Sequence, residues 1–375
     1  MTPLRIGVNA LYLLPGGVGG TEVYLRQLLR ALAQIDSPHH YLVFTNRETG
    51  PDLVPLSRQF EHCPQPVNAA NRASRIFYEQ LRLPGVLRGQ KIDVLLNPGF
   101  TAPFPTRVPS VTVFHDLQHV RHPEHFRRFE LPFWRLLLWQ AAKKSTHLIA
   151  VSQATRGDVL AHYHLSSDAV SVVTHGVEPE FFSLLRNRNE ERPYILCVST
   201  LHPHKNLDRL VRVFARLQSR HPQLRLVLAG MRGFHTERIE KQIADSGVAD
   251  SVEVTGWIAR ERLYELYRGA AVFVYPSTFE GFGMPVLEAL AVGLPVACSD
   301  IPPLREAAGE AALFFNPEHD DEMLAAMERL LSGDAFALRL SLAGPVRARQ
   351  FTWTQAARST LRCLEAAAYR SQSSS

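Results

Sequence analysis

The 375-residue sequence has few cysteines and no long apolar run. Its four cysteines (Cys63, Cys197, Cys298 and Cys363) lie far apart, and their spacing does not suggest a metal cage. Cys197 and Cys298 fall inside apolar runs, so we expect buried free thiols and a reducing, cytoplasmic setting. No segment approaches the ~20 apolar residues of a membrane-spanning helix. The N-terminus enters a strand directly and lacks the layout of a signal peptide.

The sequence also has only a small excess of one charge over the other, with 41 Lys and Arg residues against 36 Asp and Glu residues. The net charge is +5, and the positive excess lies mainly in residues 1–185. This excess is too small and too scattered for a nucleic-acid-binding surface, so no nucleic-acid partner is expected. The positive excess leaves two contacts open for the first half of the chain. It could bind peripherally to the anionic inner face of a membrane, or it could bind a phosphate-bearing acceptor. The aromatic-rich run at 131–144 predicts a buried core helix or, alternatively, an amphipathic membrane-contacting helix.

Strands alternate with helices along the whole chain, and its length favours two domains. Short apolar runs predict strands at 4–10, 41–45, 92–96, 111–114, 147–151, 170–174, 194–199, 224–229, 252–255, 271–275, 296–298 and 312–315. Because helical patterns separate them, each half is expected to be an α/β domain with a parallel sheet covered on both faces. The polar run at 178–193 predicts a linker. We therefore place the first domain at residues 1–185 and the second at residues 186–352.

The stretch from Ala271 to Cys298 carries the densest functional pattern. Within it, a loop of Glu280-Gly281-Phe282-Gly283-Met284 separates an apolar strand from a helix that begins near Pro285. Two glycines beside a helix start leave backbone N–H groups approachable by phosphate, and the helix dipole adds to the attraction. Glu280 and Glu288 would repel a bare phosphate, but they suit the hydroxyls of a sugar and a ribose. The alternative is a strand, a turn and a helix with a surface glutamate on each side.

These residues resemble a known signature. Glu280 and Glu288, with seven residues between them that include the Gly-Phe-Gly loop and Pro285, are similar to the E-x7-E signature of retaining glycosyltransferases of family 4. The resemblance implies the GT-B fold, in which two Rossmann-like, doubly wound domains face a cleft and a C-terminal helix, here within 353–375, crosses back to the first domain. It also implies transfer of a hexose, such as mannose from GDP-mannose, from a nucleotide-sugar donor to a glycan or lipid-linked acceptor in polysaccharide biosynthesis.

The resemblance also implies roles for particular residues. Catalytic roles fall on Lys205 at the donor diphosphate, on Glu280 at the donor sugar, and on the His115-Asp116 pair beyond a buried strand. Together with our own candidates from the neighbouring loops, the positions that we expect to bind the donor are Gly19, Gly20, Ser199, Thr200, Lys205, Arg232, Trp257, Ile258, Gly281, Phe282, Gly283, Met284 and Glu288. Glu288 would bind the ribose. The alternatives are a solvated loop lysine, a flexible glycine-rich turn and a buried, satisfied histidine.

Two absences concern the diphosphate. The chain contains no D-x-D, the pair with which GT-A enzymes hold a divalent ion, so we expect a reaction without a metal or another cofactor. Many family members also carry an arginine before the lysine loop, whereas this chain has Ser199-Thr200 there. Two other functions of the same fold stay open: a sugar-nucleotide epimerase and a non-catalytic nucleotide-sugar-binding protein.

Overall fold

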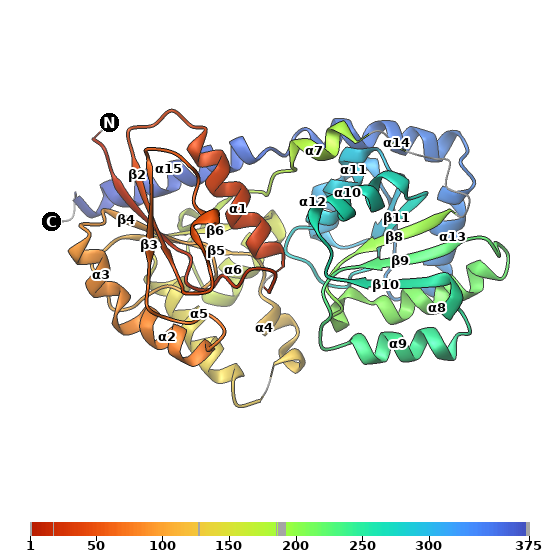
Figure 1. Cartoon of the computed structure of the whole chain (residues 1–375), viewed down its shortest axis with the longest axis horizontal. Helices are drawn as coiled ribbons and strands as arrows, with labels where there is room; N and C mark the ends of the chain where they lie inside the picture. The colour runs from red at the N-terminus through yellow and green to blue at the C-terminus, as the bar shows by residue number, and fades with distance from the viewer. Residues whose placement is uncertain (1, 18, 127, 185, 187–192, 373–375) are drawn as a thin grey trace. The chain divides into compact units, whose positions relative to one another are not determined.

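The computed structural model describes residues 2–17, 19–126, 128–184, 186 and 193–372, which form two compact units (Figure 1). Unit 1 runs to Gly176 and resumes at Trp353, and unit 2 spans Val177–Thr352. The chain thus enters unit 2 before the boundary suggested by the sequence, between residues 185 and 186. The reason is packing: Phe181 is fully buried against Tyr264 and Tyr267 of unit 2. Residues 185 and 187–192 of the expected linker, and residues 373–375 of the serine-rich tail, lie outside the described residues.

Unit 1 contains a parallel sheet in the order β3-β2-β1-β4-β5-β6-β7. Its strands are β1 (Arg5–Asn9), β2 (His40–Thr45), β3 (Phe60–Pro64), β4 (Val94–Asn97), β5 (Ser110–Phe114), β6 (His147–Ala150) and β7 (Val170–Val172). The central strands are buried on both faces, which explains their continuous Val, Ile and Leu runs. The sequence pattern misses β3, because this edge strand is half-exposed, polar and ends in proline.

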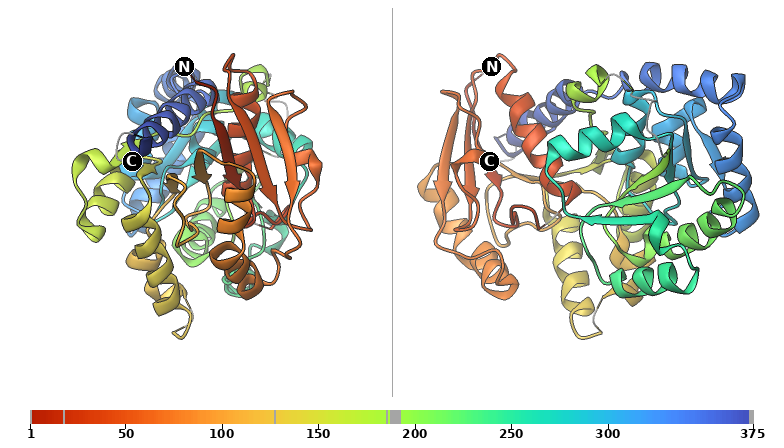
Figure 2. Two further views of the ribbon diagram at one scale, coloured as in Figure 1. Left: turned by 90° about the vertical axis from the view of Figure 1, so that its left-hand side faces the viewer. Right: turned by 45° about the vertical axis from the view of Figure 1, so that its right-hand side comes forward.

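Helices cover both faces of this sheet. They are α1 (Gly20–Ala33), α2 (Arg72–Leu81), α3 (Leu83–Gly89), α4 (Gln118–Arg121), α5 (Leu131–Lys144), α6 (Gln153–Tyr163) and α15 (Trp353–Gln372). In Figure 1, α1 and α15 lie on one side of the sheet, and α2, α3 and α5 lie on the other. Figure 2 shows the blue C-terminal helix beside the red strands, and α15 contacts α1, β4, β5 and β6. The return of the C-terminal helix to the first unit is confirmed.

Unit 2 contains a second parallel sheet, in the order β10-β9-β8-β11-β12-β13. Its strands are β8 (Tyr194–Val198), β9 (Arg225–Ala229), β10 (Val252–Gly256), β11 (Val272–Tyr275), β12 (Val296–Ser299) and β13 (Leu313–Phe315). Its helices are α7 (Pro179–Ser183), α8 (Leu207–Gln218), α9 (Thr236–Asp245), α10 (Arg260–Gly269), α11 (Met284–Val292), α12 (Pro302–Ala308), α13 (Asp320–Leu331) and α14 (Ala335–Ala348). Both units are therefore doubly wound α/β domains, which confirms the predicted fold class.

The loops that follow the strands carry the candidate site residues. Because all strands in a sheet run parallel, their carboxyl ends share one edge, where ligands bind in such folds. In unit 2 this edge places the loop after β8 beside the loop after β9. Gly230 permits that approach, because its φ is +146° and a Cβ there would lie 2.0 Å from the carbonyl oxygen of Ser199. In the described part of the chain, no helix is long and apolar enough to cross a membrane.

Candidate functional site

An ion pair marks the carboxyl edge of the sheet in unit 2. Lys205, in the turn after β8, donates from Nζ to Oε1 of Glu280 at 2.5 Å and to Oη of Tyr275 at 3.2 Å. The side chains of Lys205 and Glu280 are only 12% and 11% exposed. The structure thus brings together two residues that lie 75 positions apart. Among the described residues, one ammonium proton of Lys205 has no hydrogen-bond partner, so it can serve a ligand.

Tyr275 completes this group and was not predicted. It is the last residue of β11 and is buried. Burial and the neighbouring carboxylate of Glu280 raise the pKa of its phenol well above the ordinary value. Tyr275 therefore stays neutral and holds the ammonium group of Lys205 in place. Its position just before Pro276, at the carboxyl end of a strand, is the one sequence signal that could have identified it.

The glycine loop leads directly into α11. Gly283 precedes the first residue of the helix, Met284, at a φ of +108°, and a Cβ at Gly283 would lie 2.4 Å from Cδ2 of Leu304. Phe282 is buried, and its ring packs edge-on against Phe351 at 5.7 Å. The side chain of Phe282 therefore belongs to the core, and only its backbone can meet a donor. The Gly281-Phe282-Gly283-Met284 segment sits at the N-terminus of α11, where the helix dipole favours an anion.

Glu288 lies in a separate polar network. Its Oε2 accepts a hydrogen bond from Oη of Tyr267 at 2.8 Å, and its Oε1 accepts one from Nη2 of Arg260 at 3.1 Å. Arg260 also bonds Glu178, which in turn accepts a hydrogen bond from Oη of Tyr264 at 3.0 Å. Burial raises the pKa of the Glu288 carboxyl, and the guanidinium of Arg260 opposes this shift. Sequence spacing gives no signal for this network, since its members come from three distant segments.

The other predicted donor residues of unit 2 are dispersed. The Ser199 N–H donates to the carbonyl oxygen of Ala229 at 2.9 Å, and Thr200 follows it in the half-exposed loop after β8. Arg232 is exposed and pairs with Glu240 at 2.7 Å. After β10, Trp257 is 65% exposed and Ile258 is half-buried. These side chains lie in loops at the carboxyl edge, but their described contacts do not include the Lys205–Glu280 pair.

In unit 1, His115 directly follows β5 and is buried. Its Nε2–H donates to the carbonyl oxygen of Pro98 at 2.8 Å, and its ring packs edge-on against Tyr24 at 4.8 Å. Burial lowers the pKa of His115 to about 4. His115 is therefore neutral at neutral pH, and its Nδ1 is an acceptor. Oδ1 of the adjacent Asp116 accepts a hydrogen bond from the backbone N–H of Gln118 at 2.9 Å.

Gly19 and Gly20 form the start of α1. Gly19 has a φ of +59° and precedes the first helical residue, Gly20. Nearby, the N–H of Gly16 donates to the carboxylate of Glu22 at 2.8 Å, and Arg26 pairs with the same carboxylate at 2.9 Å. Part of this glycine-rich loop is thus already bound by an anionic side chain. Among the residues that the structure describes, no three His, Cys, Asp or Glu side chains gather in a way that could hold a metal ion.

Comparison with known proteins identifies the family. Residues 183–346 match the family described as "Glycosyl transferases group 1", and residues 18–181 match "Glycosyltransferase Family 4". The D-inositol 3-phosphate glycosyltransferase of Acidothermus cellulolyticus is 30% identical over 88% of this chain and 83% of its own length. This chain belongs to glycosyltransferase family 4. It is therefore a glycosyltransferase, as the E-x7-E resemblance implies.

Other relatives of this glycosyltransferase narrow the sugar class. The O-antigen chain mannosyltransferase B of Escherichia coli is 26% identical over 73% of this chain and 74% of its own length. Further mannosyltransferases match over 61% of their length or less. Together these relatives support hexosyl transfer. The solved sucrose-phosphate synthase of Thermosynechococcus elongatus has a TM-score of 0.78 at 20% identity and covers 96% of this chain and 98% of its own, which supports the GT-B fold.

Acidification should destabilise unit 1 between pH 6.5 and pH 4. Burial lowers the pKa of His115 to about 4, and burial and two nearby cationic groups do the same for His119. Both histidines take up protons at about pH 6.5 in the unfolded chain. Their contribution is therefore complete above pH 6.5 and is lost as the pH falls towards 4, by roughly 3 kcal/mol for each histidine. Urea unfolding at several pH values measures this loss.

The matched comparison uses His119→Gln and, as a control, the exposed His221→Gln. His119→Gln should flatten the acid-induced decrease in the free energy of unfolding, and His221→Gln should leave the wild-type profile unchanged. If all three proteins lost equal stability over this pH range, burial of His119 would not explain the acid sensitivity.

Proposed function

We propose that this glycosyltransferase transfers mannose from GDP-mannose to a glycan or lipid-linked acceptor, with retention of configuration and without a metal ion. The observation that carries the proposal is the partly buried Lys205–Glu280 pair at the carboxyl edge of the sheet in unit 2. It lies in the loops after β8 and β11, and the loop after β11 continues into the N-terminus of α11. The mannosyltransferase relatives favour this function over the epimerase and the non-catalytic alternatives.

The chemistry requires a cation at the leaving group. The bond between the anomeric carbon and the diphosphate oxygen breaks, a bond to the acceptor hydroxyl oxygen forms, and the hydroxyl proton passes to the departing phosphate. Negative charge grows on that phosphate, so a fixed cation lowers the barrier. Lys205 supplies the cation, since Glu280 and Tyr275 hold its ammonium group and leave one proton for the phosphate. The second oxygen of Glu280 accepts from a donor-sugar hydroxyl.

Glu288 takes the ribose in this scheme. A carboxylate must be oriented and ionised to accept hydrogen bonds from two neighbouring hydroxyls. Arg260 and Tyr267 fix the carboxylate plane through two hydrogen bonds, and the guanidinium of Arg260 offsets part of the effect of burial, which disfavours the ionised form. Glu178 fixes Arg260 in turn. Backbone groups of the glycine loop and of the loops after β9 and β10 would then meet the diphosphate and the base.

A membrane contact suits a lipid-linked acceptor. On α5, Leu137, Leu138, Ala141 and Ala142 are buried, so the predicted core face exists. Other side chains of the same helix are apolar and exposed: Phe133 by 49%, Leu136 by 57% and Trp139 by 47%. The helix ends at Lys143 and Lys144. An exposed aromatic face beside lysines is typical of helices that rest on anionic lipid, and we propose that α5 does so.

A donor screen tests the proposed reaction. Nucleotide sugars with each base are incubated with a mannose-terminated acceptor, with excess EDTA and without added metal, and the anomeric configuration of the product is read by NMR. GDP-mannose should be consumed and should yield the α-linked product. Loss of turnover in EDTA that magnesium or manganese restores would contradict metal independence. Conversion of UDP-GlcNAc without an acceptor would indicate an epimerase instead.

Lys205→Ala should lower kcat by about 100-fold or more, the size expected when one contact to a developing oxyanion is lost. The exposed Lys241→Ala, in α9 of the same unit, is the matched control and should keep the wild-type rate. Steady-state kinetics with the best donor measures both variants. A rate for Lys205→Ala close to that of Lys241→Ala would show that another group neutralises the diphosphate.

Replacement of two apolar residues on α5 should weaken membrane binding. The double variant Phe133→Ser/Trp139→Ser removes exposed side chains and leaves the buried face of the helix intact. Its partition onto vesicles of phosphatidylglycerol and phosphatidylcholine should fall about tenfold or more, as expected from the apolar area removed. The control is Leu338→Ser, an apolar residue on α14 that is 48% exposed, about as much as Phe133 and Trp139. Equal partition of the wild type and both variants would exclude α5 as the contact.

A further inference from the structure

A pocket of about 440 Å³ opens at the carboxyl edge of the sheet in unit 1. Its walls are mainly apolar and aromatic, and they include Tyr12, Phe100, Phe126 and Trp134. Tyr12 follows β1, and Phe100 follows β4. Aromatic walls of this kind suit the apolar face of a sugar ring. The volume exceeds what one hexose requires and leaves room for a substituent.

Arg75 of α2 lies at this pocket without a partner. It is only 7% exposed, yet its guanidinium forms no hydrogen bond or ion pair with any described residue. Burial lowers the pKa of Arg75, and the charge of Glu79, one helical turn further on, opposes that shift only in part. Glu79 instead accepts a hydrogen bond from Oγ1 of Thr101 at 3.0 Å. An unpaired buried charge is costly in a folded protein, so this guanidinium is available for an anion.

The surroundings of Arg75 favour an anion further. Arg72 begins α2, its guanidinium lies 5.3 Å from the centre of the Trp134 ring, and it pairs with Glu130 at 3.3 Å while staying exposed. No acidic residue occupies the first turn of α2. The positive end of the helix dipole therefore adds to the two arginines. Asp116 also lines the pocket, and its carboxylate suits a sugar hydroxyl rather than an anion.

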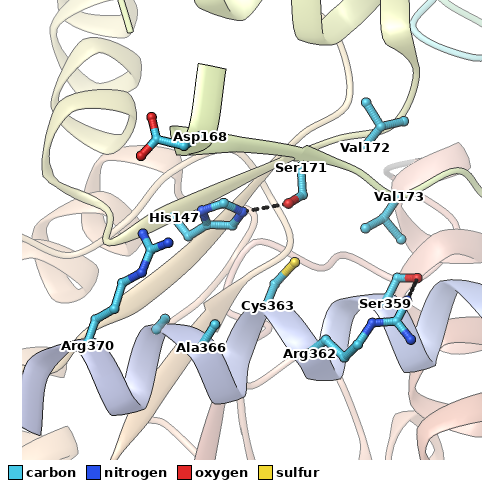
Figure 3. Close-up of a pocket in the computed structure, with 11 residues that line it drawn as sticks. His147, Asp168, Ser171, Val172, Val173, Ser359, Arg362, Cys363, Ala366 and Arg370 are labelled. Atoms are coloured by element: carbon cyan, nitrogen blue, oxygen red, sulfur yellow. Dashed lines mark hydrogen bonds between the residues drawn. The ribbon is translucent and has the colours of Figure 1, made fainter. Parts of the chain in front are cut away.

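A second pocket, between β6, β7 and α15, differs from the first because its basic side chains already have partners or contact solvent (Figure 3). It measures about 380 Å³ and also contains basic groups. There, however, Arg362 is exposed and donates to Oγ of Ser359 at 2.9 Å, and His147 bonds Oγ of Ser171 at 2.8 Å. These groups already have partners or solvent, so they do not require a ligand.

We propose that the pocket of unit 1 binds a phosphate group carried by the sugar acceptor, with Arg75 as its principal contact. The fork of guanidinium N–H groups matches two phosphate oxygens, while the aromatic walls take the sugar ring and Arg72 adds a second, exposed positive charge. This inference rests on the proposed transfer to an acceptor and names the class of that acceptor. The phosphate belongs either to a soluble sugar phosphate or to a lipid-linked sugar.

Calorimetry with mannose 6-phosphate and methyl α-mannoside tests the proposal. Lys205→Ala is used as the background, so that phosphate binding in unit 2 is weakened. The phosphorylated sugar should bind roughly 10- to 100-fold more tightly than the neutral one, as expected for charge-assisted hydrogen bonds. Arg75→Gln should remove that preference, and Arg75→Lys, which keeps the charge but loses the fork, should retain only part of it. The exposed Arg88→Gln of α3 is the matched control and should behave as the background protein.

A second arm uses phosphatidylcholine vesicles with and without a polyprenyl-phosphate-linked mannose. Binding that depends on this lipid and on Arg75 identifies a lipid-linked phosphate, and binding confined to mannose 6-phosphate identifies a soluble one. Equal affinities for the neutral and phosphorylated sugars, or a preference that survives Arg75→Gln in both arms, overturns the inference.

GDP binding is also measured for the Arg75 variants with Lys205 intact, and it shows whether the donor site of unit 2 is unaffected. The proposed transfer reaction and the proposed phosphate site can therefore fail independently. If GDP-mannose is turned over with a neutral acceptor while phosphate adds nothing, the inference fails and the proposed reaction stands. If phosphate binds through Arg75 but no donor is consumed, the proposed reaction fails and the inference stands.

Discussion

Parallel strand pairing is the constraint on which the candidate site depends. A parallel sheet returns every strand in the same direction, so the loops that carry chemistry collect at one edge and the helices occupy the faces. Lys205 and Glu280 meet for this reason, although β9 and β10 lie between them in the chain. The same arrangement collects Tyr12, Phe100 and Asp116 around one pocket of unit 1. Backbone topology thus creates sites that no local sequence segment contains.

The charged side chains at the carboxyl edges of the two sheets differ in whether an oppositely charged side chain pairs with them. Lys205 and Glu280 neutralise each other, and Arg260 lies between Glu178 and Glu288. Such pairs cost desolvation and contribute little net stability, so their value lies in the orientation of functional groups. Arg75 has no comparable partner and is costly in the free protein. A protein that tolerates such a cost at the edge of a ligand pocket has gained a preformed anion site.

The sequence predicted well what depends on periodicity and local chemistry. Most strands and the helix after Gly283 follow from apolar runs, glycines and prolines, and the E-x7-E pattern led to the correct family. Three structural features were not predicted from the sequence. The edge strand β3 lacks an apolar pattern, the partners of Glu288 come from distant segments, and the side chain of Phe282 points into the core. Each depends on which elements become neighbours, and a linear pattern does not contain that information.

The chain connectivity at the border of the units has a further consequence. Val177 pairs with Thr352 in an isolated parallel bridge, and the N–H of Val177 donates to the carbonyl oxygen of Phe351 at 3.0 Å. The segment that enters unit 2 therefore lies beside the segment that leaves it. Unit 2 is in effect an insertion into unit 1 whose two ends meet, the arrangement in which natural and engineered domain transplantation succeeds. Residues 177–352 therefore form a continuous insert whose two ends lie together, which is the geometry that exchange of the whole unit between relatives requires.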